Sequence, residues 1–234
     1  MSIIFVIGPA YKNLNVLLNT ININRTLINT IKHIYIPTND LEVFKYFKNN
    51  TNINNITCEF FRENQGHQLS CYNSIIAGMQ MILKYDSERN DDKVIFCHED
   101  CYLNDISLFN QAIYKLNTYD VVCREYNRKL AIKDINATNY YMNDTFLINK
   151  NRIYDTFNNL NLLDNFNSER NPENRFCEYF FGKAIHNLKI FSILYIHTTW
   201  DNTELGFYHI PSFPYNEENW DKKNINNIYN ENNR

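Results

Sequence analysis

Short apolar runs rich in β-branched residues alternate along the chain with longer stretches in which apolar residues recur every three or four positions. The short runs are typical of buried strands and the long stretches of amphipathic helices. The expected strands of the first hundred residues are 2–7, 33–36, 56–61 and 93–97. Between them we expect a helix at about 13–30, a helix from Leu41 to Phe47 capped by Thr38 or Asn39, and a helix ending near Tyr85. Such regular alternation predicts βαβ units and a mostly parallel sheet.

The alternation becomes looser after residue 100. We expect a helix at 106–116, strands at 119–123 and 140–148, helices from about 152 and at 175–187, and a last strand at 190–196. Together these elements predict one α/β domain over 1–215. The segment 216–234 is rich in Asn and poor in apolar residues, which predicts a frayed tail.

Composition and charge narrow the class of protein. The chain of 234 residues is 44% hydrophobic and 21% charged, which is typical of a soluble globular protein. Its net charge of −3 argues against a nucleic-acid backbone as partner. No apolar stretch approaches the ~18 residues of a membrane span, and the apolar run after Met1 is too short for a signal peptide. The six cysteines form no C-x-x-C pair, so we expect reduced thiols and a cytoplasmic location.

Asparagine is unusually abundant, at roughly one residue in six. Asn, Ile, Lys and Tyr have AT-rich codons, so the bias indicates an AT-rich genome such as that of a giant virus, a protist or a low-GC bacterium; a viral protein would act in the host cytoplasm. Four Asn-x-Ser/Thr patterns, starting at Asn24, Asn55, Asn136 and Asn143, are about the number expected by chance and carry no information about glycosylation.

Polar residues that directly follow the expected strands are the candidates for chemistry, because ligands of open parallel sheets bind at the carboxyl ends of strands. Four such segments occur, at 8–11, 38–40, 62–66 and 98–100. The last, His98-Glu99-Asp100, offers an imidazole and two carboxylates that could hold a divalent cation and, through it, a diphosphate. The alternative is a solvated turn before a helix capped by Asp105. Cys97, His98 and Cys101 lack the spacing of a structural zinc site.

Three segments resemble GT-A glycosyltransferases, which use nucleoside-diphosphate sugars. The strand Ile3–Ile7 resembles the family's first strand. The segment from Asn64-Gln65-Gly66 through Asn73 to Gly78 resembles its N-x-G…N-x-(G)-x-x-A helix. Val94–Asp100 resembles the strand that leads into its D-x-D motif, written here as H-x-D. The resemblance covers about residues 2–200 and implies a Rossmann-like GT-A domain with a mostly parallel central sheet.

The resemblance also implies a donor site. Asp100 matches the last acid of D-x-D and would bind Mn²⁺ or Mg²⁺ at the donor diphosphate, with His98 and Glu99 in the metal shell or at the ribose. Having His at the first position puts an essential metal in doubt. The other donor-binding positions implied are Gly8, Pro9, Ala10, Asn39, Asp40 and Asn73.

An inverting transferase also needs a base that deprotonates the acceptor hydroxyl. The family supplies a carboxylate from the start of a late helix, which matches Glu178, and Asp144 is the reserve candidate. Glu178 is alternatively an ordinary first-turn acid favoured by the helix dipole. His197 resembles a late histidine that completes the metal shell in some relatives, although a histidine after a strand can also be structural. Trp200 and Asp201 follow it and could line the sugar or acceptor site, or simply pack.

The leading hypothesis is therefore a metal-assisted, inverting glycosyltransferase of the hexosyl- or deoxyhexosyltransferase class, with a glycan or another hydroxyl compound as acceptor. One alternative is a degenerate GT-A domain that binds nucleotide or glycan without turnover. Another is a nucleotidyltransferase, although the segment from Gly8 to Lys12 lacks the glycine-rich basic loop typical of that class.

Overall fold

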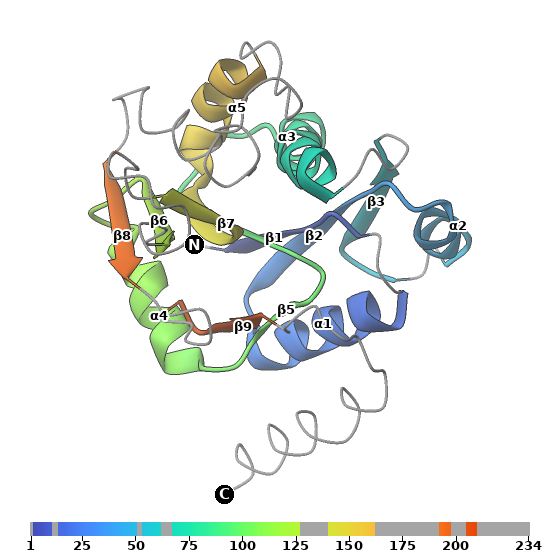
Figure 1. The fold of residues 1–234 in the computed structure, drawn as a ribbon, viewed down its shortest axis with the longest axis horizontal. Coiled ribbons are helices and arrows are strands. Elements are labelled where there is room, and N and C mark those ends of the chain that lie inside the picture. Colours follow the sequence, from blue (N-terminus) through green and yellow to red (C-terminus); the bar gives the residue numbers. More distant parts are fainter. Residues whose placement is uncertain are drawn as a thin grey trace, which may run out of the picture.

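The computed structural model describes residues 2–10, 14–50, 53–61, 67–126, 140–161, 192–197 and 205–209. A seven-stranded sheet with the order β3-β2-β1-β4-β7-β6-β8 forms its centre (Figure 1). Its strands are β1 (Ile3–Ile7), β2 (Ile31–Thr38), β3 (Ile56–Phe60), β4 (Lys93–Cys97), β6 (Val121–Tyr126), β7 (Tyr140–Asn149) and β8 (Ile193–His197). Two short strands, β5 (Cys101–Leu103) and β9 (Phe207–His209), form a separate antiparallel pair.

Helices cover both faces of the sheet. Figure 1 shows α3 (His67–Tyr85) and α5 (Ile153–Asn161) on one face, and α1 (Leu14–Leu27) and α4 (Ile106–Lys115) with the β5–β9 pair on the other. The helix α2 (Leu41–Asn49) lies beside β3 at the edge, and a short 3₁₀ turn, η2 (Lys150–Arg152), precedes α5. This is the three-layer α/β arrangement that the alternating pattern predicts.

Two apolar cores follow from the alternation of side chains along the buried strands. Phe5 and Ile95 face α1, α2 and α4, and contribute to one core. Val6 and Phe96 face α3 and α5, and contribute to the other. Every residue of β1 and of β4 is buried, which is why these strands read as continuous apolar runs without alternation.

The sheet is mostly parallel, as predicted. The strand β1 pairs in parallel with β2 and β4, β2 with β3, and β6 with β8; β7 is antiparallel to both of its neighbours. The chain runs from β1 outward through β2 to β3 and returns to the other side of β1 at β4. The order of strands therefore reverses between β1 and β4, which is the place where open α/β sheets bind ligands.

Helix starts refine the expected boundaries. Asp40, rather than Thr38 or Asn39, caps α2: its Oδ1 accepts hydrogen bonds from the backbone N–H groups of Glu42 and Val43 at 2.7 and 3.2 Å. Asp105 caps α4 as predicted. The β5–β9 pair was not predicted, because three-residue strands carry no readable period. The helix expected at 175–187 and the tail 216–234 lie outside the described residues.

Gly78 sets how closely α3 approaches the sheet. A Cβ at this position would lie 2.3 Å from Val6 Cγ1 and 3.3 Å from a ring carbon of Phe96. The absent side chain therefore lets α3 pack directly over β1 and β4. None of the described helices is long and apolar enough to cross a membrane.

Candidate functional site at the carboxyl edge of the sheet

The ends of β1, β2 and β4 are tied together at the point where the strand order reverses. The backbone N–H of Gly8 donates to the carbonyl of Cys97 at 3.0 Å. Ala10 forms a parallel bridge with Thr38, whose hydroxyl donates to the Ala10 carbonyl at 2.6 Å. The segments 8–10, 38–40 and 98–100 therefore lie next to one another, as the sequence predicts.

Gly8 is required by the close approach of two strand ends. A Cβ at Gly8 would lie 2.8 Å from Pro37 Cγ and 2.9 Å from the Pro37 carbonyl oxygen. Any side chain here would push the segment that follows β1 away from β2. The glycine thus shapes this end of the sheet through packing, whatever it contacts in a ligand.

The segment His98-Glu99-Asp100 forms a tight turn between β4 and β5, closed by a hydrogen bond from the Cys101 N–H to the His98 carbonyl at 3.1 Å. Glu99 and Asp100 are buried, with 1% and 0% of their surface exposed. His98 is partly exposed. Two acidic residues and a histidine are thus concentrated at the end of a central strand.

Two buried polar residues of α1 form hydrogen bonds with the backbone of this turn and of β5, the strand that follows it. The Thr20 hydroxyl donates to the Glu99 carbonyl at 2.6 Å, and Asn24 Oδ1 accepts from the Leu103 N–H at 2.9 Å. Both side chains are completely buried. Sequence reasoning missed them, although Thr20 and Asn24 occupy helix positions that interleave with Leu17 and Ile21 on the apolar face. The burial of Asn24 also agrees with disregarding its Asn-x-Thr pattern.

Asn39 and Asp40 lie at the end of β2, beside the segment after β1. Asn39 is 7% exposed and Asp40 is half-buried. One carboxylate oxygen of Asp40 is engaged in capping α2. Capping alone explains why an acidic residue stands at position 40. The contact of Asp40 with a nucleoside therefore stays a prediction.

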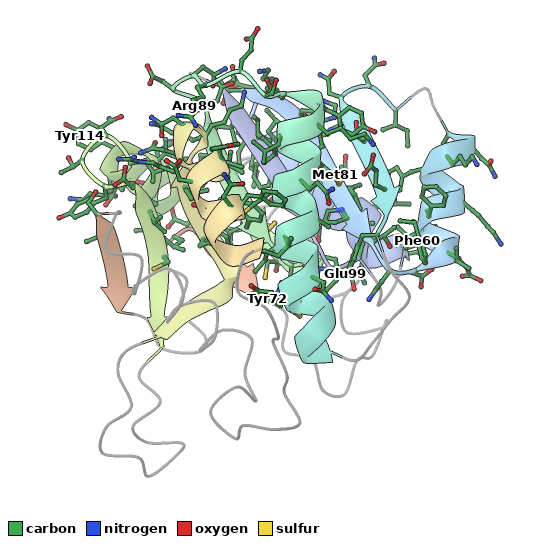
Figure 2. All side chains as sticks on the ribbon, turned by 90° about the horizontal axis from the view of Figure 1, so that it is seen from above. Phe60, Tyr72, Met81, Arg89, Glu99 and Tyr114 are labelled. Carbon is green, nitrogen blue, oxygen red and sulfur yellow. The ribbon has the colours of Figure 1, made fainter. Side chains whose placement is uncertain are left out.

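Asn73 and Tyr72 lie in the first half of α3, which starts at the carboxyl edge and runs back toward the start of β4. Figure 2 shows Tyr72 and Glu99 at the same end of the molecule, and Arg89 at the opposite end. Asn73 is half-buried. Burial raises the pKa of Tyr72 to about 12, so its phenol stays neutral at physiological pH and can only hydrogen-bond.

The candidate bases are placed only in part. Glu178 lies outside the described residues. Asp144 belongs to β7, and Thr145 pairs with Cys97 in the adjacent antiparallel strand. Continuing this register by one residue sets the backbone of Asp144 level with His98. The reserve candidate thus shares the edge with the acidic turn; Trp200 and Asp201 lie outside the described residues.

The histidines near the edge differ in their distance from the turn. His197 ends β8, which is parallel to β4 but separated from it by β7 and β6, so the two strands are about 14 Å apart. His209 is paired directly with Cys101, the residue after Asp100, and such partners have Cα atoms about 5 Å apart. Sequence reasoning missed His209 because β5–β9 pairing joins segments more than a hundred residues apart.

Gly206 fixes the segment that carries His209. Its φ of +84° is in the left-handed region, and a Cβ there would lie 2.3 Å from the Asp105 carbonyl oxygen. Its own carbonyl accepts hydrogen bonds from the N–H groups of Asn104 and Asp105 at 2.7 and 3.0 Å. The segment 205–209 is therefore firmly seated against the start of α4, next to the acidic turn.

Metal and cysteine candidates can be compared with the described geometry. Within the described ranges, no group of three or more His, Cys, Asp or Glu side chains is arranged to hold a metal ion. Mg²⁺, however, commonly binds through one or two carboxylates together with substrate phosphates. Cys71, Cys97 and Cys101 are buried and form no disulfide. Cys177 lies outside the described part of the chain.

Comparisons with known proteins agree on the fold. No protein-family model matches the sequence, and no curated protein matches it. The 2-C-methyl-D-erythritol 4-phosphate cytidylyltransferase of Francisella tularensis has 14% identity and a TM-score of 0.54, covering 94% of this chain and 97% of its own. The 4-diphosphocytidyl-2C-methyl-D-erythritol synthase of Anaerococcus prevotii has 13% identity and a TM-score of 0.53, covering 86% and 91%.

A glycosyltransferase is among the similar structures as well. The galactosyltransferase LgtC, solved in complex with donor and acceptor sugar analogues, has 14% identity and a TM-score of 0.50, covering 83% of this chain and 73% of its own. The strand order, the reversal between β1 and β4 and these likenesses lead to one conclusion: the chain has the GT-A-like, Rossmann-like fold of nucleotide-diphospho-sugar transferases.

Proposed function

We propose that the protein is a glycosyltransferase that moves a sugar from a nucleoside-diphosphate sugar to a glycan or another hydroxyl acceptor. The observation that carries the proposal is the meeting of the segments 8–10, 38–40 and 98–100 where the strand order reverses. Ligands of open α/β sheets bind at this place. The GT-A-like fold supports a nucleotide-sugar donor as that ligand.

The residues at the edge divide into two groups by chemistry. Gly8, Pro9 and Ala10 are small and buried, so a flat nucleoside could approach their backbone closely. Asn39 and Asp40 lie beside this segment, and Asn73 lies on α3. Asp100, with His98 and Glu99, would hold Mn²⁺ or Mg²⁺. The cation would neutralise charge on the departing diphosphate.

A histidine would complete the metal-binding group. The sequence indicates His197, whereas the backbone of His209 lies nearer to the acidic turn, because it is paired with the residue after Asp100. The proposal therefore includes both and ranks His209 first.

The acceptor hydroxyl needs a base, and the proposal assigns that role to Glu178, with Asp144 in reserve. A direct displacement by the deprotonated hydroxyl inverts the configuration of the transferred sugar. The base accepts the hydroxyl proton, the new glycosidic bond forms at the anomeric carbon, and the bond to the diphosphate breaks. The class of sugar we propose is a hexose or deoxyhexose.

The nucleotidyltransferase alternative is less favoured. The first loop, from Gly8 to Lys12, has one glycine and one basic residue, which is a poor phosphate-binding loop. The two reactions also give different products, because a nucleotidyltransferase releases pyrophosphate and a glycosyltransferase releases a nucleoside diphosphate.

The test uses the full-length protein and a panel of nucleotide sugars, with and without Mn²⁺. A donor at 100 times its Kd stabilises the folded state by about 2.7 kcal/mol, which raises the melting temperature by roughly 5–10 °C. We expect Mn²⁺-dependent stabilisation and release of nucleoside diphosphate, both lost in Asp100→Asn. The control is Asp91→Asn, an exposed acid at the opposite edge.

Two outcomes would contradict the proposal. Stabilisation without any donor turnover would indicate the degenerate binding domain instead. Undiminished Mn²⁺-dependent binding in a folded Asp100→Asn variant would remove Asp100 from the site.

A further inference from the structure

A cavity of about 340 Å³ lies at the end of the molecule opposite the acidic turn. It forms where the end of α3, the segment 86–89 and the start of α5 meet. Figure 2 shows Arg89, one of its lining residues, at the end opposite Glu99 and Tyr72. Of its apolar lining residues, Leu83 is half-buried, whereas Ile82 and Ile153 are each only 1% exposed and pack behind the cavity wall. It is thus separate from the proposed donor site.

Ion pairs hold one wall of the cavity in place. Lys150 Nζ lies 2.7 Å from Asp86 Oδ1, and Lys32 Nζ lies 2.8 Å from Asp86 Oδ2. The Lys150 side chain is only 2% exposed. Burial alone would raise the pKa of Asp86, but the hydrogen bonds from Lys150 and Lys32 outweigh it and lower the pKa. The Asp86 carboxylate is therefore ionised at neutral pH, and each of its oxygens is paired with one lysine.

A second part of the cavity lining is also ordered by a specific contact. The Arg89 guanidinium lies 5.2 Å from the centroid of the Tyr154 ring, a cation–π distance. Tyr154 is 48% exposed, so the part of its ring that Arg89 does not cover remains open to a ligand. A cavity whose walls are set before binding loses little conformational entropy when a ligand enters.

The lining is electrically balanced and rich in both donors and acceptors. Asp86 and Glu88 supply two negative charges, and Arg89 and Lys150 supply two positive ones. A phosphate-bearing ligand would meet two carboxylates here, so a net anion is disfavoured. Hydroxyl groups donate to carboxylates and accept from ammonium and guanidinium groups, which suits a neutral ligand carrying several hydroxyls.

We propose that this cavity is a second saccharide-binding site, without catalytic function, that takes a neutral sugar of about one or two rings. Its volume is at the lower end of the range for small-molecule sites. The Tyr154 ring and the Leu83 side chain would face the C–H surface of the sugar, and the charged side chains its hydroxyls. This site does not depend on the proposed transfer reaction and would bind sugar even if the chain transferred none.

The experiment measures binding of glucose, galactose, mannose, lactose and maltose to the full-length protein, without nucleotide or Mn²⁺, by calorimetry and saturation-transfer NMR. The test variant is Tyr154→Ala. The matched control is Tyr114→Ala, which removes another exposed tyrosine, 71% exposed on α4 and outside the cavity lining. We expect the Kd of the best sugar to rise at least tenfold in Tyr154→Ala and to stay unchanged in Tyr114→Ala.

Two further measurements separate this site from the proposed donor site. Sugar binding should persist in Asp100→Asn, and Tyr154→Ala should keep whatever donor hydrolysis the native protein has. Arg89→Ala, which removes an exposed side chain, serves as a second test should Tyr154→Ala fail to fold. Absence of binding by all five sugars, unchanged affinity in a folded Tyr154→Ala or Arg89→Ala variant, or displacement of the sugar by inorganic phosphate would overturn the proposal.

Discussion

The Thr20 hydroxyl donates a 2.6 Å hydrogen bond to the Glu99 carbonyl, joining α1 to the acidic turn across 79 residues of sequence. One helical turn later, Asn24 Oδ1 accepts from the Leu103 N–H. The two bonds hold the chain on both sides of Asp100. The position of the proposed metal-binding acid is thus set by a helix that carries none of the proposed ligands.

Thr20→Val should weaken that support while keeping the size of the side chain. Losing one buried hydrogen bond costs about 1 kcal/mol of unfolding free energy, measurable by urea denaturation. Because the turn is released, Mn²⁺-dependent nucleotide binding should weaken too. Thr20→Ser keeps the hydroxyl and should bind normally. Equal binding by the Val and Ser variants would show that the bond does not position the turn.

Gly78→Ala should destabilise the protein although alanine favours helix. The new Cβ would lie 2.3 Å from Val6 Cγ1, and such overpacking costs about 1–3 kcal/mol of unfolding free energy. The higher helix propensity of alanine returns only ~1 kcal/mol. We therefore expect a net loss of stability. Val6→Ala removes the clashing methyl group. The double variant should therefore be more stable than the sum of the two single changes predicts. Strict additivity would contradict this account of Gly78.

Lys150→Met should lower stability in a pH-dependent way. The pKa of Asp86 is lowered in the folded protein, so the carboxylate contributes stability that is present above its unfolded pKa of about 3.8 and is lost as pH falls below it. Removing Lys150 leaves Asp86 with Lys32 alone, and losing one hydrogen bond to a charged group should cost about 1.5–3 kcal/mol at pH 7.

The deficit of Lys150→Met should start to shrink below pH 3.8 and vanish as the pH falls through the lowered pKa of folded Asp86, because protonated Asp86 no longer needs its partner. Unfolding by urea at pH 7 and pH 3.5 measures both differences. Lys45→Met, at an exposed position of α2, is the control and should change little at either pH. A deficit that grows toward acid pH would reverse the assigned sign.

Glu178→Gln should separate donor binding from transfer. The amide keeps the shape and hydrogen-bonding capacity of the side chain but cannot accept the acceptor proton, so the transfer rate should drop by roughly 10²–10⁴-fold with donor affinity retained. An ordinary helix-start acid would instead cost under about 1 kcal/mol of stability at near-normal rate. That second result would move the base to Asp144, where Asp144→Asn is the same test.

His209→Ala should weaken Mn²⁺-dependent nucleotide binding more than His197→Ala does. The reason is distance along the sheet edge. His209 is paired with Cys101, the residue after Asp100, whereas β8, which ends at His197, lies three strand spacings from β4. Titration of nucleotide with and without Mn²⁺ should show a loss of about tenfold for His209→Ala. A larger loss in His197→Ala would restore the histidine that the sequence indicates.

The sequence by itself determined the layered α/β fold and the edge that carries the candidate site. Runs such as Val94–Cys97 are apolar throughout because both faces of a central strand are buried, and such a local pattern can be recognised in the sequence alone. The residues that follow these strands could therefore be assigned to one edge. Asp105 could likewise be named as a cap, since its bonds reach only two and three residues along the chain.

Only the tertiary structure decided which distant residues support that edge. Thr20 looks like an ordinary helix residue until Glu99 is folded against it, and His209 has no signal until β9 pairs with β5. The cavity beside Asp86 forms where the end of α3, the segment 86–89 and the start of α5 meet, and ion pairs from Lys32 and Lys150 hold the Asp86 carboxylate in its wall. Strand periodicity is local, whereas these contacts depend on how the sheet brings together residues many tens of positions apart.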